Sequence, residues 1–211
     1  MKINIFIACH TQTEFEHIDN HPILTPLVIN NYDAISIPNM ITDRDGPNIS
    51  HLNHSFSEMT AHYWMLHNVQ ADYIGLCHYR RFFHFLTHQV PINQMQVNKH
   101  KSFFTSLNGA PISFASASDI EPLIIHHDII LPTPLIHTMS IKDAFLSSPI
   151  HSTMYWELME TALKNMGSNG SDYCQFFETE TNLCAFNMLI AKKEVYRNIL
   201  NWVFPILFNV Y

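Results

Sequence analysis

The chain has 211 residues, 47% of them hydrophobic and 14% charged, and a formal net charge of −7. This composition excludes a disordered chain, because it supplies enough apolar residues for a buried core. The negative charge argues against a nucleic-acid partner, since phosphate binding needs a clustered positive field. The length suits one domain, and we expect residues 1–211 to form it.

The N-terminal third predicts strands separated by loops. Residues 2–9 are rich in β-forming side chains and predict a buried strand. Residues 11–26 are polar and contain prolines, so a loop is expected there. A second short strand is expected near residues 34–37, followed by a loop at residues 43–48.

Residues 55–83 predict a helix and then a strand. Ser55 and Glu58 form the pattern of a capping box, which predicts a helix over residues 55–68. Its apolar face is expected to hold Phe56, Met59, Tyr63 and Leu66. Residues 72–77 then predict a buried strand that ends at His78-Tyr79-Arg80-Arg81.

The second half predicts further alternation of helices and strands. Helices are expected at residues 89–107, 141–146, 152–165 and from 193 onward, and a short helix or a turn at 119–125. Strands are expected at 128–131 and 185–191, and a loop at 167–171. Strands that alternate with helices predict an α/β fold in which helices flank a mostly parallel central sheet.

Several sequence features bear on the compartment. No segment contains the roughly 18 uninterrupted apolar residues of a membrane span, and the apolar run at residues 3–8 is too short for a signal peptide. The four cysteines form no CxxC pair, so free thiols in the cytoplasm are expected. The apolar stretch 199–211 is either a core helix or a contact with the membrane surface, and core packing is the commoner case.

The most distinctive segment runs from Asn48 to Phe83. It reads NISHLNHSFSEMTAHYW at residues 48–64 and DYIGLCHYRRFF at residues 72–83, and weaker matches follow at DIILP (128–132) and FNMLI (186–190). These motifs resemble the DUF4422 family over nearly the whole chain. His10-Thr11 stands where the family usually has His-Lys. Members usually continue past Tyr211, so we expect this chain to lack the family's C-terminal tail.

The resemblance implies a function. The family is associated with bacterial capsular and exopolysaccharide glycosyltransferases, some of them similar to galactofuranosyltransferases. It implies a GT-A-like, Rossmann-related fold. It also implies transfer of a hexosyl unit, galactosyl or galactofuranosyl among the candidates, from a nucleotide-diphosphate sugar to a growing glycan. A UDP-sugar donor, a cytoplasmic location and peripheral association with the inner face of the membrane follow as expectations, while the oligomeric state stays open.

Two other classes of function stay open. One is a non-catalytic module that binds a nucleotide or a sugar within a larger polysaccharide-assembly protein. The other is a phosphoryl-transfer or hydrolytic enzyme, although the chain has no P-loop, nucleophile elbow or cysteine-phosphatase signature.

The nucleotide site is expected where strands end. Ligands of open α/β sheets bind at the carboxyl ends of strands. There, Arg80 and Arg81, with Tyr79, are predicted to stabilise the departing diphosphate, because guanidinium groups match phosphate oxygens. Alternatively, one arginine caps a helix or pairs with Glu58. The other expected nucleotide-sugar contacts are His10, Asn53 and Asn187.

Asp43 and Asp45 form an Asp-x-Asp pattern, which predicts a site for Mn²⁺ or Mg²⁺ or else a solvated turn before Gly46. An inverting transferase also needs a base that deprotonates the acceptor hydroxyl. The candidates for that base are Glu58, His78, Asp128 and His151, and Glu58 is alternatively a capping residue only. Tyr63 and Trp64 are expected in the core rather than against a sugar.

Overall fold

The computed structural model describes residues 1–211 except residues 17, 19, 31, 36–39, 89–92, 98–99, 105–112 and 168. The described chain groups into two compact units. The first contains Met1–Met95, Phe103–Pro132 and Phe186–Leu200, and the second contains Gln96–Ser102, Thr133–Ala185 and Asn201–Tyr211. The expectation of a single domain stays a prediction.

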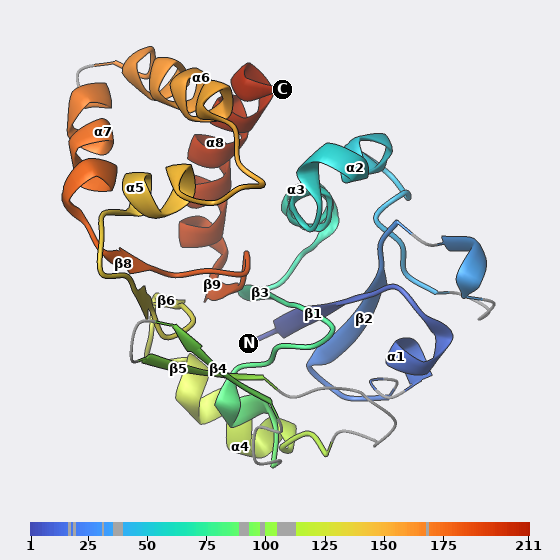
Figure 1. Ribbon diagram of the computed structural model, residues 1–211. Coiled ribbons are helices and arrows are strands. Elements are labelled where there is room, and N and C mark those ends of the chain that lie inside the picture. The colour runs from blue at the N-terminus through green and yellow to red at the C-terminus, as the bar shows by residue number, and fades with distance from the viewer. Residues whose placement is uncertain are drawn as a thin grey trace. The chain divides into compact units, whose positions relative to one another are not determined.

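The first unit is built on a five-stranded sheet with the order β2-β1-β3-β9-β6 (Figure 1). Its strands are β1 (Ile3–Cys9), β2 (Leu24–Val28), β3 (Tyr73–Cys77), β6 (Ile129–Ile130) and β9 (Leu189–Lys192). β1 pairs in parallel with β2 and β3, while β9 pairs antiparallel with both β3 and β6. Four strands therefore share one direction and β9 opposes them, which confirms the predicted α/β fold with a mostly parallel sheet.

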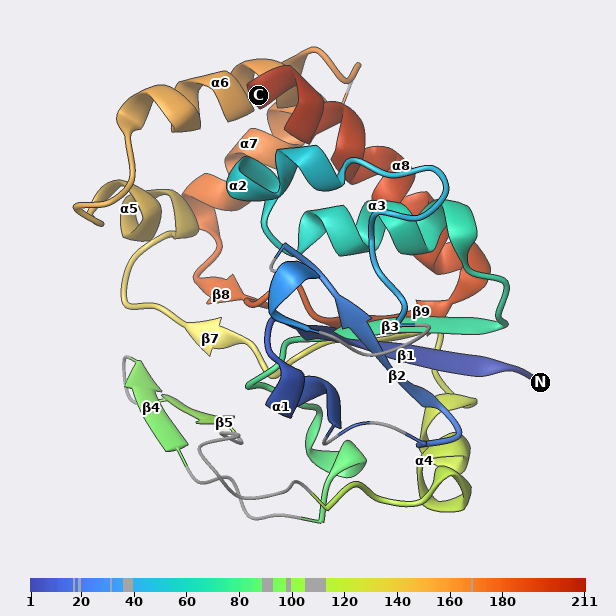
Figure 2. The same ribbon diagram turned by 90° about the vertical axis from the view of Figure 1, so that its right-hand side faces the viewer.

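Side chains alternate between the two faces of the sheet, as strand geometry requires. Ile5, Ile7 and Cys9 of β1 pack in a core with Ile120 and Ile124 of α4 (Ala117–Ile124). On the other face the Phe6 ring meets the Trp64 ring edge-on at 5.7 Å. Trp64 belongs to α3 (Met59–Asn68), so α3 and α4 cover opposite faces (Figure 2).

The first unit also contains several short helices. They are α1 (Gln12–Glu16), the 3-10 helices η1 (Tyr32–Ala34), η2 (Ser50–Leu52) and η3 (His84–Leu86), and α2 (Asn53–Phe56). A separate two-stranded sheet pairs β4 (Asn93–Val97) with β5 (His100–Phe104), and the boundary between the two units crosses both strands. The last helix, α8 (Lys193–Val210), begins in the first unit and ends in the second.

The second unit is mainly helical. It contains α5 (Ile141–Leu146), α6 (Thr153–Lys164), α7 (Gly170–Thr179) and a small sheet of β7 (Leu135–Ile136) with β8 (Asn182–Leu183). Its core joins Ala162, Leu163, Cys174 and Ile206. Lys142 donates hydrogen bonds to Glu160 at 2.7 Å and to Glu178 at 2.9 Å, which connects the three short helices.

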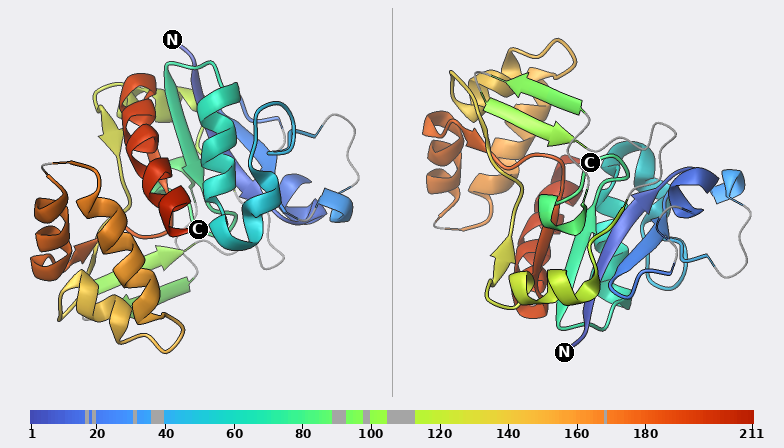
Figure 3. Two further views of the ribbon diagram at one scale, coloured as in Figure 1. Left: turned by 90° about the horizontal axis from the view of Figure 1, so that it is seen from above. Right: turned by 90° about the horizontal axis from the view of Figure 1, so that it is seen from below.

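Several predictions of secondary structure were wrong. Residues 24–28 form a strand rather than a loop, because Pro26 lies on edge strand β2, where a missing donor is tolerated (Figure 3). Where it is described, segment 89–107 forms β4 and β5 instead of a helix. Tyr32–Ala34 is a 3-10 helix, and the rest of the strand expected at 34–37 is mostly outside the described residues.

The helix expected over residues 55–68 is divided. Ser57 has a φ of 50°, which separates α2 from α3, and no capping side chain precedes α3. Of the predicted apolar face, Phe56 is buried, whereas Met59, Tyr63 and Leu66 are only half-buried. The apolar residues that α3 buries are Ala61, Trp64 and Met65. The core placement of Trp64 is confirmed.

The C-terminal stretch packs in part as a core helix. Leu200, Phe204 and Ile206 are buried, which confirms the core interpretation for this face of α8, whereas Trp202 and Phe208 are exposed. All four cysteines are free thiols. Among the described residues, no helix combines the length and the apolar character needed to cross a bilayer.

Candidate functional site

The His78-Tyr79-Arg80-Arg81 segment forms a tight turn directly after β3. The Arg81 backbone N–H donates to the His78 carbonyl at 3.1 Å, and the two residues form an isolated antiparallel bridge. The turn therefore places four consecutive side chains at the carboxyl end of a strand in the interior of the sheet, where ligands of α/β folds bind. This position was predicted from the sequence.

The two arginines of this turn lie on aromatic rings. The exposed Arg80 guanidinium carbon is 4.7 Å from the centre of the Tyr79 ring, and that of half-buried Arg81 is 4.2 Å from the Phe186 ring. Burial, together with the neighbouring Arg80, lowers the pKa of Arg81. An arginine keeps its charge at neutral pH even so, so the turn carries two positive charges.

Glu58 faces this turn from the residue before α3. Its Oε1 lies 3.4 Å from Nε2 of His78. Burial alone would raise the pKa of Glu58, but its own backbone N–H and the facing His78 outweigh burial and lower it. Glu58 is therefore ionised at neutral pH. It does not cap α3 through its side chain, so the capping interpretation is wrong.

His78 is neutral, and its two ring nitrogens face different groups. Burial lowers its pKa to about 4, against the opposing charge of Glu58. Nδ1 accepts the Arg80 backbone N–H at 3.1 Å, so the proton of the neutral ring resides on Nε2, which faces Glu58. His78 thus orients Glu58 and the turn, and Glu58 is the stronger candidate for the base.

His10 and Asn187 complete the cluster. His10 follows β1, the parallel neighbour of β3, and its ring meets the Tyr79 ring edge-on at 5.0 Å. Its Nδ1 lies 3.2 Å from the Ile29 carbonyl. Asn187 lies two residues before Leu189, the partner of Leu76, so the antiparallel register brings Asn187 beside the end of β3.

Asn53, Asp43 and Asp45 belong to an adjoining hydrogen-bonded network. The Asn53 amide donates to the Ser57 carbonyl and to the Thr60 hydroxyl, both at 3.0 Å, which holds the break between α2 and α3. The Thr60 hydroxyl in turn donates to Asp43 at 2.6 Å. Asn53 therefore supports the start of α3 next to Glu58.

The Asp43–Asp45 pair does not fit a two-carboxylate metal site. Asp43 is 0% exposed, and its other oxygen accepts the Tyr32 hydroxyl at 2.5 Å. Burial raises the pKa of Asp43. Asp45 is exposed and accepts the Thr42 hydroxyl at 2.9 Å, so only one of the two carboxylates is accessible. Within the described ranges, no group of three or more His, Cys, Asp or Glu residues is placed to hold a metal ion.

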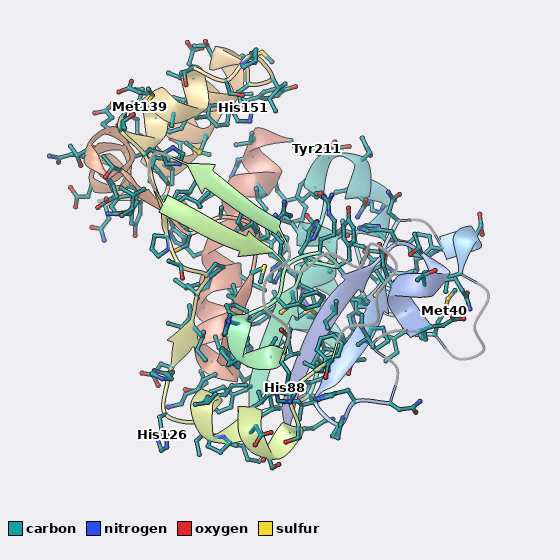
Figure 4. All side chains as sticks on the ribbon, turned by 60° about the horizontal axis from the view of Figure 1, so that its bottom comes forward. Met40, His88, His126, Met139, His151 and Tyr211 are labelled. Atoms are coloured by element: carbon teal, nitrogen blue, oxygen red, sulfur yellow. The ribbon has the colours of Figure 1, made fainter. Side chains whose placement is uncertain are left out.

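Asp128, the third expected base candidate, lies outside the cluster, and His151, the fourth, belongs to the second unit. Asp128 is exposed and pairs with Lys192 at 2.6 Å. Lys192 pairs with Tyr73 at the start of β3. Asp128 therefore lies near the end of the sheet where β3 begins, whereas His78 follows the end of β3. His151 belongs to the second unit, on the segment between α5 and α6, where its ring stacks on Phe145 at 4.0 Å (Figure 4).

Sequence reasoning missed two contributors next to the cluster. Phe186 has a φ of 79° and supports Arg81, and His62 is buried on α3 with Nε2 2.7 Å from the Asn187 carbonyl. Nothing in the local sequence marks Phe186 as a turn residue. A histidine among the apolar residues of a helix was the one available signal for His62.

Comparisons with known proteins agree with this fold. The family model described as "Domain of unknown function (DUF4422)" matches residues 4–211. The solved structure titled "WbbM bifunctional glycosytransferase apo structure" is similar with a TM-score of 0.76 and 22% sequence identity. The similarity covers 100% of this chain and 37% of that chain, so this chain spans little more than a third of its length. No curated protein matches.

Proposed function

We propose that this chain, which belongs to the DUF4422 family, is a nucleotide-sugar-dependent glycosyltransferase of GT-A-like fold. It transfers a hexosyl unit, with galactosyl and galactofuranosyl as candidates, from a UDP-sugar to a growing surface polysaccharide. The whole-chain similarity to a structure titled as a bifunctional glycosyltransferase supports the proposal. So does the cluster of charged side chains at the carboxyl end of β3.

The observation that carries the proposal is the arginine-bearing turn beside an ionised carboxylate. Transfer of a sugar leaves a nucleoside diphosphate, and its negative charge must be stabilised as the bond to the sugar breaks. Arg80 and Arg81 supply two charged donors at the carboxyl end of β3, and their guanidinium carbons lie 4.7 and 4.2 Å from the centres of aromatic rings. In this proposal the arginines take the part that a metal ion plays in other transferases.

Glu58 has the properties of a base for the acceptor. It is ionised, it lies beside the arginine turn, and its Oε1 lies 3.4 Å from Nε2 of neutral His78. An acceptor hydroxyl placed on Glu58 gives up its proton to the carboxylate as its oxygen attacks the sugar, and the departing diphosphate leaves toward the arginines. In this proposal Tyr79 and His10 contact the nucleotide.

Turnover of UDP-sugars tests the proposal. UDP release is measured for the wild type, Arg80→Ala and Arg81→Ala with a panel of UDP-hexoses and an oligosaccharide acceptor. Loss of one phosphate-stabilising group should lower kcat by about 100-fold or more. Arg197→Ala, which removes an exposed arginine of α8, should keep wild-type activity. Full activity of both turn variants contradicts the proposal, and nucleotide binding without UDP release favours a non-catalytic binding module.

A further inference from the structure

A buried histidine connects α3 to the turn that precedes β9. His62 is 1% exposed, and its two ring nitrogens contact groups far apart in sequence. Nδ1 lies 2.8 Å from the hydroxyl of Tyr196 on α8, and Nε2 lies 2.7 Å from the Asn187 carbonyl oxygen. Tyr196 is 0% exposed. Three elements therefore meet at one imidazole.

The chemistry of the partners fixes the direction of both hydrogen bonds. A carbonyl oxygen can only accept, so Nε2 carries the proton that points at Asn187. Burial lowers the pKa of His62 to about 4, so the ring is neutral and its Nδ1 is an acceptor. The Tyr196 hydroxyl must then donate to Nδ1. The chain of donors runs from Tyr196 through His62 to the Asn187 carbonyl.

The turn held by this chain of hydrogen bonds has an unfavourable backbone conformation. Phe186 and Asn187 have φ values of 79° and 52°, both in the left-handed region. Asparagine tolerates this region, but a bulky residue such as phenylalanine adopts it rarely and only where surrounding contacts impose it. The hydrogen bond from His62 to the Asn187 carbonyl is such a contact.

The strained turn places an aromatic ring under Arg81. The Arg81 guanidinium carbon lies 4.2 Å from the centre of the Phe186 ring, within the range of a cation–π interaction. The conformation of the turn therefore sets where this ring lies, and the ring helps to set where the guanidinium lies.

We propose that His62 and Tyr196 are positioning residues for Arg81. They hold the Phe186–Asn187 turn in its left-handed conformation so that the Phe186 ring orients the guanidinium toward a bound diphosphate. The identity of that ligand rests on the proposed function, whereas the coupling from Tyr196 to Arg81 rests on the geometry alone.

Two matched tyrosine variants test the coupling. Tyr196→Phe removes the hydroxyl that donates to His62. Tyr73→Phe removes the hydroxyl of another buried tyrosine, 5% exposed, which donates to the Ile125 carbonyl at 3.1 Å and lies at the other end of β3. Both variants delete one buried phenol oxygen, so a purely structural role predicts similar losses of stability and equal effects on Arg81.

The readout is the Nε–H signal of Arg81 in the ligand-free, ¹⁵N-labelled protein, assigned by its disappearance in Arg81→Lys. Tyr196→Phe should shift this signal and speed its hydrogen exchange, and Tyr73→Phe should leave both unchanged. Phe186→Tyr keeps a ring and should retain the wild-type signal, whereas Phe186→Gly accepts the backbone angle without the ring and should alter it. An unchanged signal in Tyr196→Phe, or an equal change in Tyr73→Phe, overturns the inference.

Binding of UDP provides the second arm. Tyr196→Phe should raise the dissociation constant for UDP about fivefold or more, the size of a modest coupling between sites, and Tyr73→Phe should not change it. If the wild type itself does not bind UDP, the proposed function fails, and the Arg81 signal alone then decides whether His62 and Tyr196 position this arginine. If UDP binds equally to all three proteins, the positioning role is contradicted.

Discussion

Glu58 faces a histidine that burial keeps neutral. Such a pair differs from an ordinary salt bridge, because only the carboxylate carries charge at neutral pH. The arrangement leaves Glu58 able to accept a proton while it stays fixed beside two arginines. The groups around Glu58, rather than its residue type alone, therefore identify it as the candidate base.

Glu58→Gln tests this role at the scale of a single residue. Glutamine preserves the volume of the side chain, but it cannot take a proton. We expect kcat to fall about 100- to 10,000-fold, the range of general base catalysis, with little change in the urea midpoint of unfolding. Glu194→Gln, at an exposed glutamate of α8, is the control. A Glu58→Gln enzyme with wild-type kcat would exclude this carboxylate as the base.

Some site residues were predictable because they follow strands, and others were not. Arg80 and Arg81 stand directly after a recognisable buried strand, so the rule for strand ends located them. His62 and Tyr196 are 134 positions apart, and no local pattern indicates that they meet. Asp128 precedes β6, and β6 runs in the same direction as β3. The Asp128 side chain therefore lies near the start of these strands, away from the arginine turn that follows the end of β3.

At the scale of elements, the turns and edges were harder to predict than the strands and helices of the core. The buried strands β1 and β3 and the helices α4, α5 and α6 follow from apolar runs and periodicity. β2 was missed because a proline interrupts its pattern, and α7 because it begins at Gly170 within a stretch that resembles a loop. The break at Ser57 overrides a capping-box pattern, because contacts outside the segment decide its conformation.

Gly170 shows how closely two helices approach in the second unit. A Cβ added there would lie 2.5 Å from the Leu163 carbonyl oxygen and 2.6 Å from the Lys164 Cα, both backbone atoms of α6. Gly170→Ala should therefore force α6 and α7 apart and lower the free energy of unfolding by about 1–3 kcal/mol. The urea midpoint measures this loss, and exposed Ser171→Ala is the control. An unchanged midpoint in Gly170→Ala would mean that the helices have room at this crossing.

At the scale of the molecule, buried neutral histidines link folding to pH. His62 and His78 both have pKa values of about 4, below the ordinary value of 6.5. Between these values the unfolded chain binds protons that the folded chain does not, so stability falls as the pH drops from 6.5 to 4. Each histidine contributes up to about 3 kcal/mol to this loss, at about 1.4 kcal/mol per pKa unit.

Chemical unfolding between pH 7.5 and 4.5 checks this link. His78→Gln should show a smaller loss of stability over that range than the wild type, because one buried titrating group is gone. His88→Gln, which replaces an exposed histidine, should retain the wild-type pH dependence. The interpretation is wrong if removal of His78 leaves the pH dependence unchanged.

Calorimetric titration of UDP in the presence of EDTA tests the central claim most directly, namely that the arginine turn after β3 holds a nucleoside diphosphate. The wild type should bind UDP without added metal, and Arg81→Ala should bind it at least about tenfold more weakly, a difference of about 1.4 kcal/mol. Arg197→Ala should bind like the wild type. Absence of UDP binding by the wild type without metal, or equal binding by wild type, Arg80→Ala and Arg81→Ala, would contradict the claim.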